Sequence, residues 1–167
     1  LPAHTTLLTG TWPLSHGVRD NTLFTVAPAM RTLGEALVER GWRTAASVGA
    51  FVLDKRYGLD QGFERYAGPA QASSATSTMA ERPASAVIDD AAAWLQTVAR
   101  DERFFLWVHL FDPHHPYQAP AEHGGPTADG YDAEIAYADA ELGRLLDGLQ
   151  ASGRLAETLV IATSDHG

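Results

Sequence analysis

The sequence contains no cysteine in its 167 residues, which excludes disulfide bonds and thiolate zinc sites within it. A chain without cysteine persists in either redox environment, so this absence leaves the compartment open. Basic residues are few, because 12 Lys and Arg stand against 21 Asp and Glu and give a net charge of −9. We therefore expect no nucleic-acid partner, since such a partner requires a basic patch. No apolar run is long enough to span a bilayer, and we expect no membrane span in these residues.

The remaining composition is that of a globular protein. Apolar residues make up 45% of the chain, and its length suffices for one domain with a hydrophobic core. The sequence begins with Leu1, in the middle of a motif, and it ends directly after an expected strand. We therefore expect residues 1–167 to form a single partial domain that is truncated at both ends, with any targeting signal lost.

Short apolar runs alternate with amphipathic stretches along the chain, which is typical of α/β proteins. The patterns predict a short helix within residues 1–10 and further helices over residues 28–40, 83–100 and 131–149. They predict strands over residues 43–48, 104–110 and 158–163, a loop over 10–26 and a mobile surface loop over 67–80. Right-handed crossovers would make the strands parallel, with helices on both faces of the sheet. The expected fold is an incomplete three-layer αβα sandwich with a mostly parallel central sheet.

Chemistry in such sheets collects beyond the carboxyl ends of the strands. Asp165 and His166 follow the expected strand 158–163 and offer one carboxylate and one imidazole. This pair suits zinc or manganese, and it suits calcium only if the imidazole turns away. Taken alone, the dipeptide more often forms an Asp-capped turn with a surface histidine.

A second polar cluster follows the expected strand 104–110. It places four ionisable side chains within seven residues, namely His109, Asp112, His114 and His115. Imidazoles there could hold an anion or protonate a leaving group, and two prolines would stiffen the loop. The alternatives are that His109 is a hydrogen-bonded core histidine and that His114 and His115 are solvated.

A third candidate is the helix entry at residues 1–10, which carries His4. Helix N-termini attract anions through free backbone N–H groups, and a nucleophile placed just before such a helix would be activated. Caps and packing explain the threonines of this segment equally well.

Three stretches together resemble the sulfatase family of the alkaline phosphatase superfamily, and they cover nearly the whole chain. The first comprises residues 1–10 and 13–19. The corresponding family pattern is Cys or Ser, any residue, Pro, a small residue and Arg, followed by a helix that ends in Leu-Thr-Gly. The second is residues 105–109 running into Pro-His-His-Pro-Tyr at 113–117. The third is residues 163–167, preceded by Tyr-Ala-Asp at 137–139 and Leu-Gly at 142–143.

The resemblance implies an alkaline phosphatase-like fold and a role for particular residues. The nucleophile would lie immediately before Leu1, and further metal ligands would come from outside residues 1–167. His114 corresponds to the family histidine that contacts the substrate anion or the leaving group. Asp165 and His166 correspond to the metal-binding pair, so a divalent ion (calcium, zinc or manganese) is the expected cofactor.

Two departures from the family pattern bear on the substrate. His4 replaces the Arg of the formylglycine maturation motif, so formylglycine is not expected, and His4 itself becomes a catalytic candidate. The usual Gly-Lys-Trp-His is Gly-Ala-Phe-Val here at 49–52, so the sulfate-gripping Lys and His are absent. Lys55 or Arg56 could substitute as a substrate-binding cation. These losses favour an unmodified nucleophile and a phosphoester or phosphonate substrate.

The resemblance therefore implies hydrolysis of a small-molecule or glycan sulfate ester, or of a phosphate ester, at a metal centre. Within the superfamily, the alternatives are a phosphodiesterase, a phosphonate hydrolase or a phospho-group transferase with a Thr or Ser nucleophile. Outside enzymes, the alternatives are a pseudoenzyme or binding domain that kept the fold, or an α/β domain with coincidental motifs. We expect residues 1–167 alone to be inactive. The resemblance favours an extracytoplasmic location, and the oligomeric state stays open.

Overall fold

The computed structural model describes residues 1–69, 81–125 and 130–166, and the central element of the fold is a parallel sheet. Its three strands are β1 (Arg43–Val48), β2 (Arg65–Ala67) and β3 (Phe104–His109), in the order β2-β1-β3. Both strand pairs are parallel, as predicted for β1 and β3 from right-handed crossovers. Most of the predicted mobile loop, residues 70–80, lies outside the described residues.

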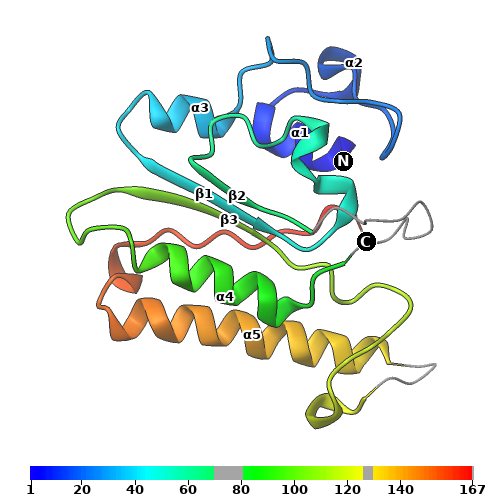
Figure 1. The fold of residues 1–167 in the computed structure, drawn as a ribbon, viewed down its shortest axis with the longest axis vertical. Coiled ribbons are helices and arrows are strands. Elements are labelled where there is room, and N and C mark those ends of the chain that lie inside the picture. The colour runs from blue at the N-terminus through cyan, green and yellow to red at the C-terminus, as the bar shows by residue number, and fades with distance from the viewer. Residues whose placement is uncertain (70–80, 126–129, 167) are drawn as a thin grey trace.

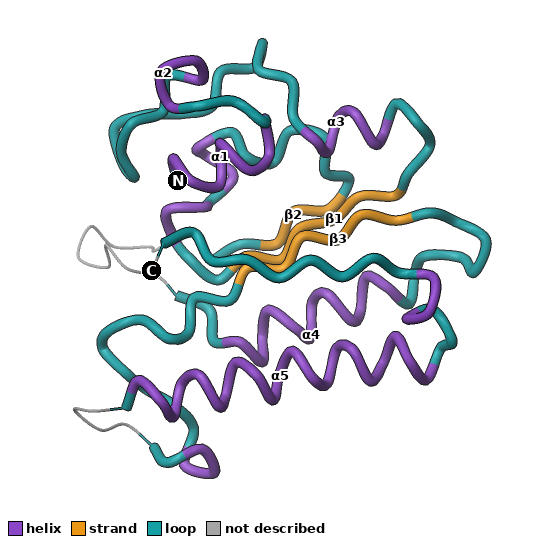
Figure 2. The backbone as a smooth tube through the Cα atoms, turned by 180° about the vertical axis from the view of Figure 1, so that it is seen from behind, coloured by secondary structure: helices purple, strands orange, loops and turns teal. Residues whose placement is uncertain are grey.

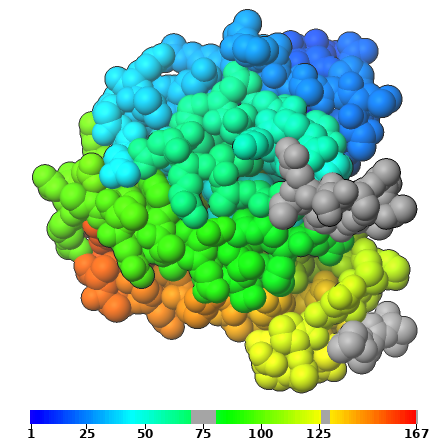
Figure 3. Space-filling model, in the orientation of Figure 1, coloured from blue at the N-terminus to red at the C-terminus, as the bar shows by residue number. Residues whose placement is uncertain are grey.

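Helices cover both faces of the sheet, so the three-layer arrangement is confirmed (Figure 1). One layer holds the short helices α1 (Pro2–Thr9), α2 (Pro13–His16) and α3 (Leu33–Val38). The other holds α4 (Ala84–Leu95) and α5 (Tyr131–Ala151), which run side by side in the backbone view of Figure 2. The surface view of Figure 3 shows the N-terminal layer and α5 at opposite ends of the molecule. None of the described helices is long and apolar enough to cross a membrane.

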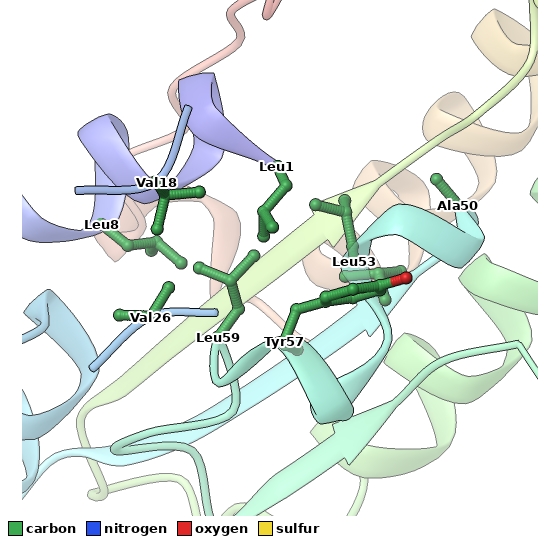
Figure 4. Close-up of a cluster of buried hydrophobic side chains, with 10 residues drawn as sticks. Leu1, Leu8, Val18, Val26, Ala50, Leu53, Tyr57 and Leu59 are labelled. Carbon is green, nitrogen blue, oxygen red and sulfur yellow. The ribbon is translucent and has the colours of Figure 1, made fainter. Parts of the chain in front are cut away.

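The largest core cluster lies between the sheet and the N-terminal layer (Figure 4). It joins Leu1 and Leu8 of the first helical segment to Leu53, Tyr57 and Leu59 of the chain that follows β1. A second cluster on the opposite face packs Ile88 and Ala91 of α4 against Leu145 of α5. Burial of these side chains fixes α1 above the carboxyl ends of the strands, where the candidate site lies.

The structure corrects several predicted element boundaries. Helix α3 begins at Leu33 rather than near residue 28, because Thr32 and Glu35 form a capping box. Helix α4 ends at Leu95 rather than Arg100, and its chain continues as turns that still bury Val98. Three apolar side chains of α3 and α5 are more than two-fifths exposed, namely Leu33, Val38 and Ile135.

The predicted strand at residues 158–163 is wrong. In the described part of the chain this segment forms no strand, and Leu159 and Ile161 are 83% and 78% exposed. It passes along the β3 side of the sheet in Figures 1 and 2, yet no ladder joins it to β3. The side chains of β3 are correspondingly only half-buried, although its apolar run predicted a strand covered on both faces. An apolar run indicates burial only if another element is present to cover it.

Candidate active site

The candidate site lies where the start of α1, the end of β3 and residue 165 meet. The rings of His4 and His109 are 4.8 Å apart between centroids and meet edge to face. The Nδ1 atom of His4 lies 3.8 Å from Oδ2 of Asp165. Trp107 of β3 closes one side of this group, with its ring 5.6 Å from that of His4. The structure thus brings together two predicted site residues, His4 and Asp165, that are far apart in the sequence.

Burial keeps both imidazoles of this group neutral. It lowers the pKa of His4 to about 3, with the neighbouring His109 lowering it further and Asp165 opposing the shift. Burial likewise lowers the pKa of His109 to about 4. The contact between His4 and Asp165 is therefore no ion pair at neutral pH, and at 3.8 Å it is too long for a hydrogen bond.

Within residues 1–69, 81–125 and 130–166, one buried nitrogen of each ring has no hydrogen-bond partner. These atoms are Nδ1 of His4, whose residue is only 5% exposed, and Nδ1 of His109. Buried polar atoms in folded proteins are nearly always paired, and unpaired ones mark a functional position or an absent ligand. The simple core-histidine interpretation of His109 is therefore incomplete.

The backbone nitrogen of Leu1 belongs to the same neighbourhood. It donates a hydrogen bond to Oδ1 of Asn21 at 2.6 Å. The backbone nitrogen of Leu1 thus lies near the carboxylate of Asp165 and the rings of His4 and His109.

His114 lies in the loop after β3 and is exposed. Its ring stacks on Phe111 with centroids 4.1 Å apart, and Phe111 in turn lies 6.4 Å from His109. The Nδ1 atom of His114 lies 2.8 Å from the carbonyl oxygen of His115. A carbonyl only accepts, so Nδ1 donates this hydrogen bond and Nε2 is the ring nitrogen outside it.

Of the other two predicted residues, Lys55 lies apart from this group, whereas His166 adjoins Asp165 at the surface. Lys55 lines a surface pocket of about 320 Å³ with Asp54, Tyr66 and residues 67–69. Within the described ranges, no hydrogen bond or ion pair joins Lys55 to the histidines or to Asp165. His166 is 79% exposed, and its Nε2 atom lies 3.6 Å from Oδ1 of Asp165.

A divalent ion is compatible with the donor set but is not fully enclosed by it. Residues 1–69, 81–125 and 130–166 contain no group of three or more His, Cys, Asp or Glu side chains arranged to hold a metal ion. Asp165 and His166 supply one carboxylate and one imidazole, and the unpaired nitrogens of His4 and His109 lie beside them. Mixed oxygen and nitrogen donors of this kind suit zinc or manganese, with further ligands required to complete the shell.

One buried residue near the site escaped the sequence analysis. Glu134 in the first turn of α5 is 3% exposed and accepts hydrogen bonds from the loop that carries His114. A signal was present, because position 134 lies on the face of the helix that also carries Tyr137, Leu145 and Leu149. A single acid on an apolar face predicts a buried carboxylate with specific partners.

Comparison with known proteins gives the family. The family model described as Sulfatase matches residues 2–167. The chain belongs to the sulfatase family. A search of the curated proteins finds no match.

Solved structures similar to this sulfatase-family chain confirm the fold. The phosphonate monoester hydrolase of Agrobacterium radiobacter has a TM-score of 0.75 and 17% identity, over 99% of this chain and 52% of its own. BT4656, solved with D-glucosamine-2-N,6-O-disulfate, has a TM-score of 0.70 and 14% identity, over 92% of this chain and 53% of its own. A protein of the alkaline phosphatase superfamily from Vibrio parahaemolyticus has a TM-score of 0.67 and 18% identity, over 89% of this chain and 38% of its own. The fold is thus alkaline phosphatase-like, and the chain spans about half or less of these structures.

Proposed function

We propose that the intact protein that contains this chain hydrolyses sulfate esters, or the related phosphate and phosphonate esters, at a divalent metal ion. The observation that carries the proposal is the convergence of His4, His109 and Asp165 beside the backbone nitrogen of Leu1. The family resemblance assigns the nucleophile to the position just before Leu1. A nucleophile there would adjoin a carboxylate able to hold a cation and would precede the N-terminus of α1.

Each residue of the chain has a distinct task in this proposal. Asp165 and His166 hold the metal, which when bound supplies charge neutralisation to the ester oxygens and lowers the pKa of an attacking hydroxyl. His4 and His109 contribute neutral nitrogens in a buried, water-poor wall beside them. His114, on the exposed side, acts in its imidazolium form, in which Nε2–H donates to a non-bridging oxygen or protonates the leaving oxygen.

A phosphate or phosphonate ester is the second candidate substrate, and the state of His4 favours it. In formylglycine sulfatases the corresponding Arg supplies a permanent positive charge and a fork of donors. Burial lowers the pKa of His4 to about 3, so this side chain supplies no positive charge at neutral pH. An unmodified Thr or Ser nucleophile is the form of the reaction that needs no formylglycine.

The proposed substrate is a small-molecule or glycan ester. One similar structure holds a disulfated glucosamine and another is a phosphonate monoester hydrolase, which supports both ester classes. Lys55 and its pocket provide a positive side chain for an anionic substituent of such a molecule. The family resemblance further favours an extracytoplasmic location.

The intact protein tests this proposal with three nitrophenyl substrates: the sulfate, the phosphate and the phenylphosphonate. After treatment with a chelator, zinc, manganese and calcium are added back one at a time. We expect hydrolysis that is lost with the chelator and restored by zinc or manganese. Preference for the phosphate or phosphonate would identify the second candidate. If no ester is cleaved and calorimetry detects no bound metal, the protein is a pseudoenzyme and the proposal is wrong.

A further inference from the structure

The carboxylate of Glu134 bridges two backbone positions of the loop that presents His114. Its Oε2 atom accepts the backbone N–H of His114 at 3.0 Å, and its Oε1 atom accepts the backbone N–H of Gln118 at 2.6 Å. Pro113 and Pro116 have no N–H group, so only His114, His115, Tyr117 and Gln118 can donate from residues 113–118. Two of these four donors are held by one side chain of α5.

This carboxylate is buried without a compensating cation. Glu134 is 3% exposed, and in the ranges that the structure describes no Lys or Arg forms an ion pair with it. Burial of a carboxylate is unfavourable unless hydrogen bonds satisfy it. The two backbone N–H groups provide that satisfaction, and each oxygen requires one of them. No other side chain of similar size offers two acceptor oxygens without a donor.

Helix α5, which carries Glu134, is fixed to α4 by side-chain contacts. Three residues further along α5, the hydroxyl oxygen of Tyr137 accepts the backbone N–H of Ser85 at the start of α4 at 2.9 Å. Arg144 of α5 forms an ion pair with Asp89 of α4, with 2.7 Å between its guanidinium and the carboxylate. The ring of His114 is fixed from its other side by the stack on Phe111. The loop is therefore held between α5 and the end of β3.

We infer that Glu134 is a positioning residue that clamps the loop 114–118 and so sets where His114 meets the substrate. This inference rests on the proposed function, in which His114 contacts the anion or the leaving group. A displacement of about 1 Å at a reacting group can lower a rate by roughly 100-fold. Loss of the clamp therefore affects turnover through His114 and leaves the metal pair untouched.

The test compares four variants of the intact protein: Glu134→Gln, His114→Ala, the double variant, and Asp132→Asn as the matched control. Glu134→Gln keeps the size of the side chain but turns one acceptor into an N–H₂ donor that faces a backbone N–H. Asp132 lies in the same first turn of α5, carries the same charge and is exposed. Hydrogen exchange of the peptide 112–120, zinc affinity and kcat/KM are measured for each.

We expect Glu134→Gln to lose exchange protection in peptide 112–120 only and to lower kcat/KM by about 10- to 100-fold, with zinc affinity unchanged. The double variant should be no slower than His114→Ala, because the clamp acts through that ring. Asp132→Asn should match the unmodified protein in all three measurements. Unchanged protection in Glu134→Gln, or a double variant slower than His114→Ala, overturns the clamp. An unchanged kcat/KM in His114→Ala instead overturns the role of His114 in the proposed function. The exchange measurement still tests the clamp in that case, so the two failures can be told apart.

Discussion

The Nδ1 atom of His4 lies 3.8 Å from Oδ2 of Asp165, so the start of α1 and the last described segment meet at one point. Neither residue is in an ion pair with the other at neutral pH, since the pKa of His4 is lowered to about 3 by burial. A carboxylate beside neutral imidazoles is an arrangement that a cation would complete.

Asp165→Asn should weaken zinc binding by the intact protein. An amide oxygen is a poorer ligand than a carboxylate, and loss of even an outer-shell partner lowers metal affinity by 10- to 100-fold, so a decrease of at least about 100-fold is expected. Titration calorimetry measures the change. Asp147→Asn is the control, because Asp147 is exposed on α5 and undergoes the same chemical substitution. Equal zinc affinity for the two variants would remove Asp165 from the site.

His114→Ala should reduce kcat/KM far more than His115→Ala does. The two histidines are adjacent and exposed, yet only His114 stacks on Phe111 and orients its Nε2 atom through a bond to a backbone carbonyl. Loss of a general acid typically lowers the rate by about 100- to 10,000-fold, whereas His115→Ala keeps the carbonyl that holds His114. Steady-state kinetics with the best nitrophenyl ester separates the two. Comparable losses in both variants would point to a general effect on the loop.

Gly62→Ala should destabilise the fold much more than Gly41→Ala. Both glycines have positive φ, of 81° and 74°, so each substitution strains the backbone by roughly 1–2 kcal/mol. Only at Gly62 would the new Cβ meet other atoms, since it would lie 2.0 Å from the backbone nitrogen of Glu35. That clash requires the start of α3 to move away from the loop before β2. Denaturant unfolding of both variants measures the difference, and equal free energies of unfolding would contradict the close approach.

Local sequence patterns correctly predicted elements that other described elements cover. The strand at 43–48 and the helix from residue 131 were placed by apolar runs and by periodicity, and the structure confirms them. The segment 158–163 has a more apolar sequence than 43–48 but forms no strand, because no described element covers it. Sequence patterns record the tendency of a segment to be buried, whereas its pairing depends on what lies beside it.

The site was only partly predictable for a related reason. Asp165, His4 and His114 were found because the family resemblance and strand ends point to them, and their roles remain predictions. The contact of His4 with Asp165, and the clamp of Glu134 on residues 114 and 118, join segments remote in sequence. No local spacing encodes such contacts, because they arise only when α1 and α5 pack on opposite faces of the sheet.

The ion pair of Glu64 with Arg43 should make part of the stability depend on pH. Hydrogen bonding to Arg43 is the main cause that holds the pKa of Glu64 below its ordinary value of 4.5, and Trp94 Nε1–H donates to the same carboxylate at 3.0 Å. A lowered pKa in the folded state means that the stabilisation is present above pH 4.5 and is lost as pH falls through the folded-state pKa. The pair is partly exposed, so the effect should be modest and should shrink with added salt.

The variant Glu64→Gln isolates this contribution. We expect its Tm to lie below that of the unmodified protein at pH 6–7, and the difference to shrink as the pH is lowered from about 4.5 towards 3. Glu157→Gln serves as the control, because Glu157 is exposed and the same substitution there should shift Tm by the same small amount at every pH. Thermal unfolding followed by circular dichroism at each pH gives both curves. A difference for Glu64→Gln that stays constant, or that grows as the pH falls, would show that the carboxylate charge is not what Arg43 and Trp94 stabilise.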